Sequence, residues 1–307
     1  MSAPRKQHYV PQTYLKNFST LTKSIDRIFT LHKDKRIIIS TNVRDIATER
    51  NFYTIGNLED KYIWENTYAR VIEPLMRDVI SNVTMLCKNV LIKNGSLILT
   101  QEMKEDLAIS IMCQLLRGKQ TRSYMSSLYS KKIPETIEES KDHFKLNRNK
   151  TQKLKDIIGK EDFFKKIAMD VVLNPEGLNR YINVLMNKRF ILFKINGKEE
   201  FITSDNPVMF LNVITLNVKP FNNGIRDNKT AIFFPINPKL LLGIYDKSLW
   251  FDKLRRYDNR LAIIDDCKDK SFIETHNKKQ YEQCFNQVYA KNRGVLENII
   301  VQSDSLY

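Results

Sequence analysis

The stretch RFILFKINGKEEFIT, residues 189–203, decides the fold class, because the helical periodicity of the preceding chain gives way to strands here. Asn196 and Gly197 lie between two strand-like runs, and Asn-Gly in this setting is the strongest short-range signal for a two-residue hairpin turn. The register of such a hairpin, extended past its ends, would set Lys188 across from Asp205. The pattern therefore predicts an antiparallel hairpin that brings a cation to the Asp-Asn-Pro sequence.

The chain before this stretch is mostly helical in pattern. Apolar residues recur at helical spacing over residues 58–91, where Pro74 starts a new helix or kinks the first one. A long helix is predicted from Thr100 to about Leu128, and further helical patterns continue to Asn187. We expect the middle of the chain to be all helix.

Strands are predicted on both sides of this helical middle. Residues 27–31 and 36–40 alternate or cluster apolar residues around a polar turn, which predicts an N-terminal hairpin. After residue 203, the expected elements are strands near 208–211, 231–234 and 240–245 and a late helix over 273–291.

No repeat or linker separates independent domains. We therefore expect a single α+β domain over residues 1–307, a central helical bundle region flanked by an N-terminal hairpin and a C-terminal, mostly antiparallel sheet. Its parts are an extended and hairpin part (1–57), a helical part (58–187) and a sheet part with the late helix (188–307).

Composition narrows the class of protein. With 307 residues and 42% apolar side chains, the chain can bury a sizeable core. Its four cysteines show no CxxC spacing and its four histidines are scattered, so we expect no structural zinc. No apolar run approaches the length of a membrane span, and the first residues lack a signal-peptide pattern. The expected location is the cytoplasm, with reduced thiols and no membrane partner.

The formal net charge of +15 favours association with phosphates. Residues 117–160 hold twelve Lys or Arg against five Asp or Glu, a net charge of 12 − 5 = +7 in one helical stretch. A nucleic acid or another polyanion is therefore a candidate partner. The alternative is a solvated helical surface in a chain of biased composition.

The opening QHYVPQ, residues 7–12, predicts a strand-to-helix junction, because the residue before Pro11 is pushed toward extended geometry and proline suits the first turn of a helix. The junction would hold His8 and Gln12 in place. His8 could act as a general base or metal ligand, and Gln12 could orient water. The alternative is that both side chains bond to backbone groups nearby.

The long helix carries a narrow polar stripe on an otherwise apolar surface. Its members recur at spacings of three and four: Asp106, Ser110, Gln114, Arg117 and Thr121. Arginine in such a position needs a carboxylate when buried, and Glu65, Glu73 and Asp205 are the candidates. A structural ion pair and a phosphate-binding arginine are both consistent with the stripe.

Residues 203–207, Thr-Ser-Asp-Asn-Pro, form the second polar motif. Asp205 and Glu73 could together bind Mg²⁺ or Mn²⁺, which prefer carboxylates and water. Asn206 and Ser204 could orient a substrate. The alternative is an Asx-turn, since an aspartate before Asn-Pro can bend the chain by accepting backbone amides.

These landmarks occur in a fixed order along the chain. They are the HYVPQ opening, Asn51-Phe52-Tyr53, Glu65, Glu73, Gln114, Arg117, Arg122, Asp205-Asn206-Pro207 and Phe234-Pro235-Ile236-Asn237-Pro238. In this order they resemble DUF4238, a bacterial family of unknown function. The resemblance implies a single intracellular bacterial domain with a polar cluster of unassigned purpose, and it permits a defence-associated effector. Members more often have two histidines at the opening and Leu-Ser-Pro in the later motif, where this chain has Gln7-His8 and Ile236-Asn237-Pro238.

The residues predict one of two functions. The first is a metal-assisted hydrolase of phosphodiester or phosphoryl substrates, such as a nuclease, without a nucleotide cofactor because no Walker or GxGxxG loop is present. In it His8 is the base, Glu73 and Asp205 bind the metal, Gln12 and Asn206 orient water or substrate, and Gln114, Arg117, Arg122 and Ser204 bind the substrate. The alternative is a non-catalytic protein that binds nucleic acid or a partner with its basic helical surface.

Overall fold

The computed structural model describes residues 6–55, 59–140, 142–143, 145–158, 163, 166–167, 170, 174–218 and 224–304. The fold is α+β, as predicted. Among the described residues, one of two five-stranded sheets has its strands in the order β11-β6-β10-β9-β8. Their bounds are β6 (Arg189–Asn196), β8 (Met209–Asn212), β9 (Thr230–Asn237), β10 (Leu240–Tyr245) and β11 (Arg260–Asp265). The pairs are antiparallel except for β11 and β6, so the expected mostly antiparallel sheet is present.

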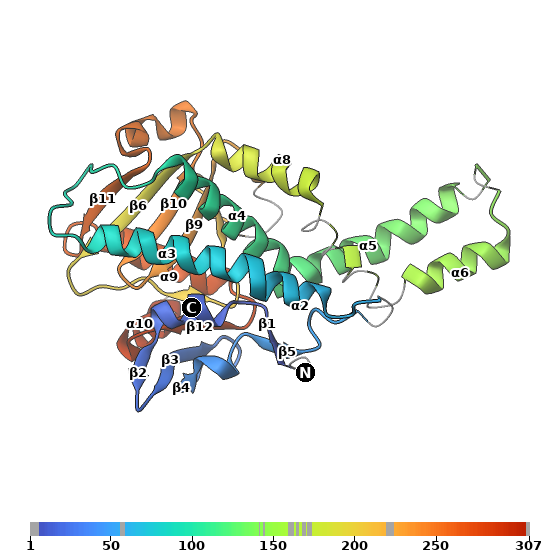
Figure 1. The fold of residues 1–307 in the computed structure, drawn as a ribbon, viewed down its shortest axis with the longest axis horizontal. Helices are drawn as coiled ribbons and strands as arrows, with labels where there is room; N and C mark the ends of the chain where they lie inside the picture. The colour runs from blue at the N-terminus through green and yellow to red at the C-terminus, as the bar shows by residue number, and fades with distance from the viewer. Residues whose placement is uncertain are drawn as a thin grey trace.

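Both faces of this sheet are covered, which explains its nearly continuous apolar strands. On one face Phe190 and Leu192 pack into a core with helices α3 (Glu73–Lys88), α4 (Gln101–Arg117) and α8 (Pro175–Met186). Figure 1 shows α3 and α4 lying across the strands. On the other face Ile191 and Ile195 pack with Ile273 of α9 (Lys270–Gln283) and with the 3₁₀-helical segment Leu249–Tyr257.

A second sheet joins distant parts of the chain. The predicted N-terminal hairpin is confirmed as β3 (Ile25–His32) and β4 (Ile38–Asn42). β2 (Thr20–Thr22) pairs with the start of β3, on the edge opposite β4. β3 also pairs with β12 (Gln287–Ala290), and β12 pairs with β7 (Thr203–Ser204). Helix α10 (Arg293–Asp304) packs against this sheet, and β1 (Lys6–His8) pairs separately with β5 (Thr48–Arg50).

The helical part begins with α2 (Ile63–Thr67), followed by a π-helical turn (Tyr68–Ile72) and α3. Pro74 lies in the first turn of α3, as predicted. The expected long helix from Thr100 is instead two helices, because Gly118 takes an extended conformation after α4 and α5 (Lys119–Ser140) begins beyond it. Helices α5 and α6 (Arg148–Ile158) extend from the body as an arm (Figure 1), and this name is used below for these two helices.

The hairpin predicted around Asn196-Gly197 is wrong. A type I′ turn needs positive φ at both central residues, and only Gly197 has one, with φ of 150°. Positive φ favours glycine at this position, and a Cβ atom there would also collide with the Asp266 carboxylate. β6 pairs with β10 and β11, while the amide of Phe201 donates to the Pro238 carbonyl at 2.8 Å. These tertiary partners replace the local pairing.

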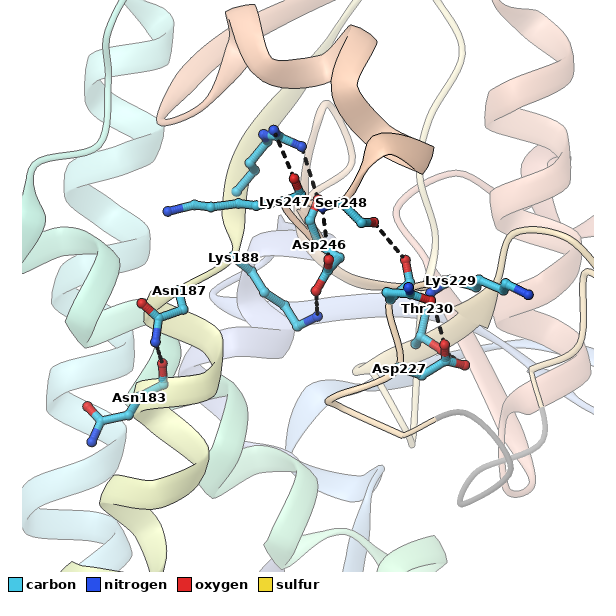
Figure 2. A network of polar contacts seen from close by, with 11 residues as sticks. Asn183, Asn187, Lys188, Asp227, Lys229, Thr230, Asp246, Lys247 and Ser248 are labelled. Carbon is cyan, nitrogen blue, oxygen red and sulfur yellow. Dashed lines mark hydrogen bonds and ion pairs between the residues drawn. The ribbon is translucent and has the colours of Figure 1, made fainter.

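Lys188 therefore does not lie beside Asp205. Figure 2 shows its ammonium donating to Asp246 Oδ2, at 2.9 Å, and Asp246 also accepts the amide of Ser248. The neighbouring Arg189 donates to the carbonyls of Asp246 and Phe251. Lys188 and Arg189 thus hold the segment after β10 in place, which is a structural role.

The late helix also differs from its prediction. α9 ends at Gln283, and the chain then turns into β12 within the range predicted as helical. Cys284 is extended, with φ of −58° and ψ of 151°, and the amides that follow it are bound by a side chain from another part of the chain, described below. Among the residues that the structure describes, no helix combines the length and apolarity needed to cross a lipid bilayer.

Candidate functional site

The junction of α4 and α5 gathers most of the landmark residues. Arg117 ends α4 and Lys119 begins α5. Two groups of side chains meet the junction: the arginine cluster, defined as His8, Tyr53, Glu65, Glu73 and Arg117, and the Asp-Asn cluster, defined as Ser204, Asp205, Asn206, Gln280 and Gln283. Four members of the polar stripe predicted on the long helix, Ser110, Gln114, Arg117 and Thr121, are buried, whereas Asp106 is half-buried. Gln114 and Arg117 face the N-terminal segments at this junction.

Arg117 is the centre of the arginine cluster, and 2% of its surface is exposed. Its Nε donates to the Tyr53 hydroxyl at 2.8 Å, and its Nη2 donates to the His8 carbonyl at 2.5 Å and to Glu73 Oε1 at 3.0 Å. The guanidinium also lies 4.3 Å from the centroid of the Tyr68 ring. Of the three carboxylates predicted as partners, Glu73 forms the ion pair.

The electrostatics of this cluster keep Arg117 charged. Burial opposes the charge, but Tyr53 and Glu73 outweigh that effect and raise the pKa of Arg117. Its Nη1 is buried without a hydrogen-bond partner among the described residues, as are the Tyr68 hydroxyl and Gln114 Oε1. Such unpaired groups are costly, so they mark a place where a water or a ligand atom could be held.

Glu65 belongs to the arginine cluster, and the sequence suggested it only as a possible ion-pair partner for Arg117. It lies in the first turn of α2 and is half-buried. Burial raises the pKa of Glu65 to about 7, Arg117 opposes that rise, and the negative charge of Glu73 adds to it. A carboxyl that titrates near neutral pH beside a fixed cation can exchange protons as a general acid or base.

His8 and Gln12 lie together, as the junction predicted. Gln12 Nε2 is 3.4 Å from His8 Nδ1. Burial and the charge of Arg117 lower the pKa of His8 to about 4, so its ring is neutral at pH 7 and a weak proton acceptor. The main polar link between His8 and Arg117 is the backbone carbonyl of His8. The catalytic roles of His8 and Gln12 stay predictions.

Gln114 and Arg122 bind the backbone of N-terminal segments. Gln114 Nε2 donates to the Tyr9 carbonyl at 3.0 Å. Arg122 donates to the Phe52 carbonyl at 2.7 Å, and its guanidinium lies 3.3 Å from the centroid of the Phe52 ring. These contacts attach residues 8–10 and 51–53 to the helices, and the predicted substrate contacts of Gln114 and Arg122 stay predictions.

Asp205 is the centre of the Asp-Asn cluster, and 1% of it is exposed. Its Oδ1 accepts the amide of Phe285 at 2.8 Å, and its Oδ2 accepts the amides of Asn286 and Gln287 at 2.6 and 3.0 Å. Burial raises the pKa of Asp205 to about 6, and the three amides oppose that rise. These bonds end α9 and place β12 beside β7.

Ser204 and Asn206 are held by glutamines from α9. Gln280 Nε2 donates to Ser204 Oγ at 2.7 Å and to the Asn206 carbonyl at 3.0 Å. Gln283 Nε2 donates to the same carbonyl at 2.6 Å, and Nδ2 of the Asn206 side chain donates to Gln283 Oε1 and to Gln120 Oε1 of α5. Sequence reasoning missed Gln120, Gln280 and Gln283, although glutamines three residues apart on a helix were a visible signal.

Lys119 connects the two clusters. Its ammonium lies 2.6 Å from Glu49 Oε2 and 5.0 and 5.9 Å from the centroids of the Tyr9 and Phe285 rings. It also favours the ionised form of Asp205. Lys119 thus lies between the segment that carries His8 and the segment whose amides Asp205 binds.

Glu73 and Asp205 share no hydrogen-bond or ion-pair partner among the described residues, and Asp205 already accepts three amides. These contacts do not favour a common ion, and a shared Mg²⁺ or Mn²⁺ stays a prediction. Within the described parts of the chain, Asp265, Asp266 and Cys267 bring three potential ligand atoms within 4.8 Å. Asp265 accepts the amides of Cys267 and Lys268 in its own loop, and Asp266 accepts the amide of Lys198 in the turn after β6, which explains the cluster without a metal.

Comparison with known proteins gives one match. The family model described as "Protein of unknown function (DUF4238)" covers residues 6–294. No curated protein and no solved structure matches the chain.

Proposed function

The chain belongs to the DUF4238 family, and we propose that it binds nucleic acid through the arm. The observation that carries this proposal is the arm itself, a basic helical pair that extends from the body (Figure 1). A projecting element with exposed cations can reach phosphates along a backbone without moving the core.

The charge of the arm supports this function. Arg148, Lys150 and Lys153 of α6 are exposed, as are Lys131 and Lys132 of α5. Among the described residues none of these five forms an ion pair, whereas Lys155 is paired with Glu138 at 3.0 Å. A surface cation without an ion-pair partner breaks no existing ion pair when it binds phosphate. Each such contact also releases a condensed counterion from the nucleic acid, which favours binding.

Reversing two of these charges should weaken binding. The variant Lys150→Glu/Lys153→Glu is expected to bind RNA or DNA roughly tenfold more weakly, and the slope of log affinity against log salt should fall by about 2. Fluorescence anisotropy with labelled single-stranded and duplex RNA and DNA, between 50 and 200 mM salt, measures both quantities.

A matched control separates a local contact from net charge. Lys253 and Arg256 are exposed, have the same spacing and lie on the body. The variant Lys253→Glu/Arg256→Glu removes the same total charge and should bind almost as the wild type does. Equal weakening by both variants, or no salt-dependent binding by the wild type, would refute the proposal.

A second candidate function is hydrolysis of the bound nucleic acid, and the observation that favours it is Glu65. Its pKa of about 7 beside Arg117 and Glu73 suits a general base for attack by water. Glu73 has the carboxylate type that Mg²⁺ and Mn²⁺ prefer, and 23% of its side chain is exposed.

Cleavage assays test this candidate. Substrate cleavage with Mg²⁺ or Mn²⁺ should rise with pH as Glu65 ionises around pH 7, and Glu65→Gln should lower the rate roughly 100-fold while leaving binding unchanged. Glu102→Gln, at an exposed carboxylate in the first turn of α4, is the control and should keep wild-type activity. Cleavage that persists in Glu65→Gln would exclude Glu65 as the base.

A further inference from the structure

A cavity of about 500 Å³ lies outside the site described above. It is called the lysine pocket here and is defined by six of its lining residues, Lys88, Lys194, Glu200, Asn237, Lys239 and Lys291. The pocket is built where the C-terminal end of α3 meets the end of β6 and the turn between β9 and β10. Because α3 runs away from the arm, the pocket and the arm are at opposite ends of the molecule (Figure 1).

The pocket is strongly basic. Lys194 Nζ donates to the Cys87 carbonyl at 2.6 Å, and Lys239 Nζ donates to three carbonyls in the turn at residues 197–199, at 2.6 to 3.0 Å. These bonds position the two ammonium groups without neutralising them. Lys88 and Lys291 are exposed at the rim, and none of the four lysines is paired with a carboxylate of the described residues.

Glu200 is the acidic residue of the lysine pocket, and it favours a ligand that can donate a hydrogen bond. It is 7% exposed, and its Oε1 accepts from Asn292 Nδ2 at 2.7 Å. Its Oε2 is buried and has no hydrogen-bond partner among the described residues. Leaving a buried carboxylate oxygen unpaired is unfavourable, so a donor from outside the chain would stabilise it.

The later proline motif also belongs to this pocket. Asn237 donates from Nδ2 to Thr84 Oγ1 at 3.2 Å and accepts the amide of Lys239 at 2.9 Å. The motif thus ties α3 to the β9–β10 turn at the pocket. This gives the motif a role that the site at the α4–α5 junction does not provide.

We propose that the lysine pocket binds a mononucleotide whose base carries an exocyclic amine. Lysine ammonium groups bind phosphate as point charges, and carboxylates accept hydrogen bonds from base amines such as that of cytosine. The volume is in the range of small-ligand sites. The phosphate lies among the lysines, and the amine donates to Glu200 Oε2.

Calorimetric titration with CMP, UMP and cytidine tests each part of this proposal. CMP is expected to bind more tightly than UMP, which lacks the amine, and more tightly than cytidine, which lacks the phosphate. The double variant Lys88→Gln/Lys291→Gln, at two exposed positions, should weaken CMP binding roughly tenfold. Glu200→Gln should remove the difference between CMP and UMP.

Two further variants make the outcome decisive. Lys131→Gln/Lys132→Gln removes two exposed charges from the arm and should leave CMP affinity unchanged. Lys150→Glu/Lys153→Glu should do the same, so the pocket and the nucleic-acid proposal succeed or fail separately. Absence of CMP binding, equal affinity for CMP and UMP in the wild type, or equal loss in the arm variants would overturn the proposal.

Discussion

Replacing Arg117 with alanine is expected to lower the free energy of unfolding by about 3 kcal/mol. The substitution leaves the His8 carbonyl and the Tyr53 hydroxyl without their donor and removes the partner of Glu73. It also opens a cavity beside the Tyr68 ring. Urea denaturation followed by circular dichroism measures the change.

Arg77→Ala is the matched control for this experiment. Arg77 also bonds to a carboxylate, Asp78 at 2.8 Å, but both side chains are more than half exposed. An exposed pair of this kind contributes little to stability, so Arg77→Ala should leave the free energy of unfolding nearly unchanged. If Arg117→Ala were no more destabilising than Arg77→Ala, the arginine cluster would not be a structural centre of the fold.

Asp205→Ala is expected to lower the free energy of unfolding by about 2 kcal/mol at pH 7. Three buried amides, of Phe285, Asn286 and Gln287, lose their acceptor, and the end of α9 and the start of β12 lose their connection to β7. Asp156→Ala, at an exposed aspartate of α6, should change stability by less than about 0.5 kcal/mol.

The effect of Asp205→Ala should also depend on pH. The pKa of Asp205 is about 6 when folded, against a reference of 3.8, so the folded protein holds this proton more tightly. Its contribution to stability is therefore greatest below about pH 4 and declines as the pH rises to 6. The gap between wild type and variant should narrow from pH 4 to pH 7. A gap that widens over this range would contradict the burial of this carboxyl.

Asp205→Ala also discriminates between its two predicted roles. A catalytic aspartate would lose turnover with the fold intact, whereas the three amide bonds indicate that stability changes first. Comparing nuclease activity with unfolding free energy on the same samples distinguishes the two results.

Local patterns predicted the elements whose signals are local. Pro74 marked the start of α3, and the alternation around residues 33–35 marked the hairpin of β3 and β4. Likewise, the helical spacing of Gln114 and Arg117 predicted that they lie on one polar stripe of the helix. In each case the residues that decide the structure lie within one or two turns of one another.

Elements decided by distant partners could not be predicted in this way. Asn196-Gly197 does not form the predicted hairpin because β6 pairs with β10 and β11. α9 ends earlier than predicted because Asp205 accepts the backbone amides that follow it. The position of Arg117 in the stripe predicted a carboxylate partner, but the sequence did not indicate which of Glu65, Glu73 and Asp205 it would be. Such choices depend on packing between segments more than forty residues apart, such as Arg117 and Glu73.

The second sheet, in which β3 pairs with β12, has a consequence for how the chain acquires its fold. β3 is made early in synthesis, yet its neighbour β12 is formed by residues 287–290, and β12 in turn supplies the partner of β7. Loop closure over such long separations is slow, and an unpaired strand edge invites contact with other chains until it is complete. Nascent chains of this protein must therefore keep the edge of β3 protected until residues 287–290 have left the ribosome.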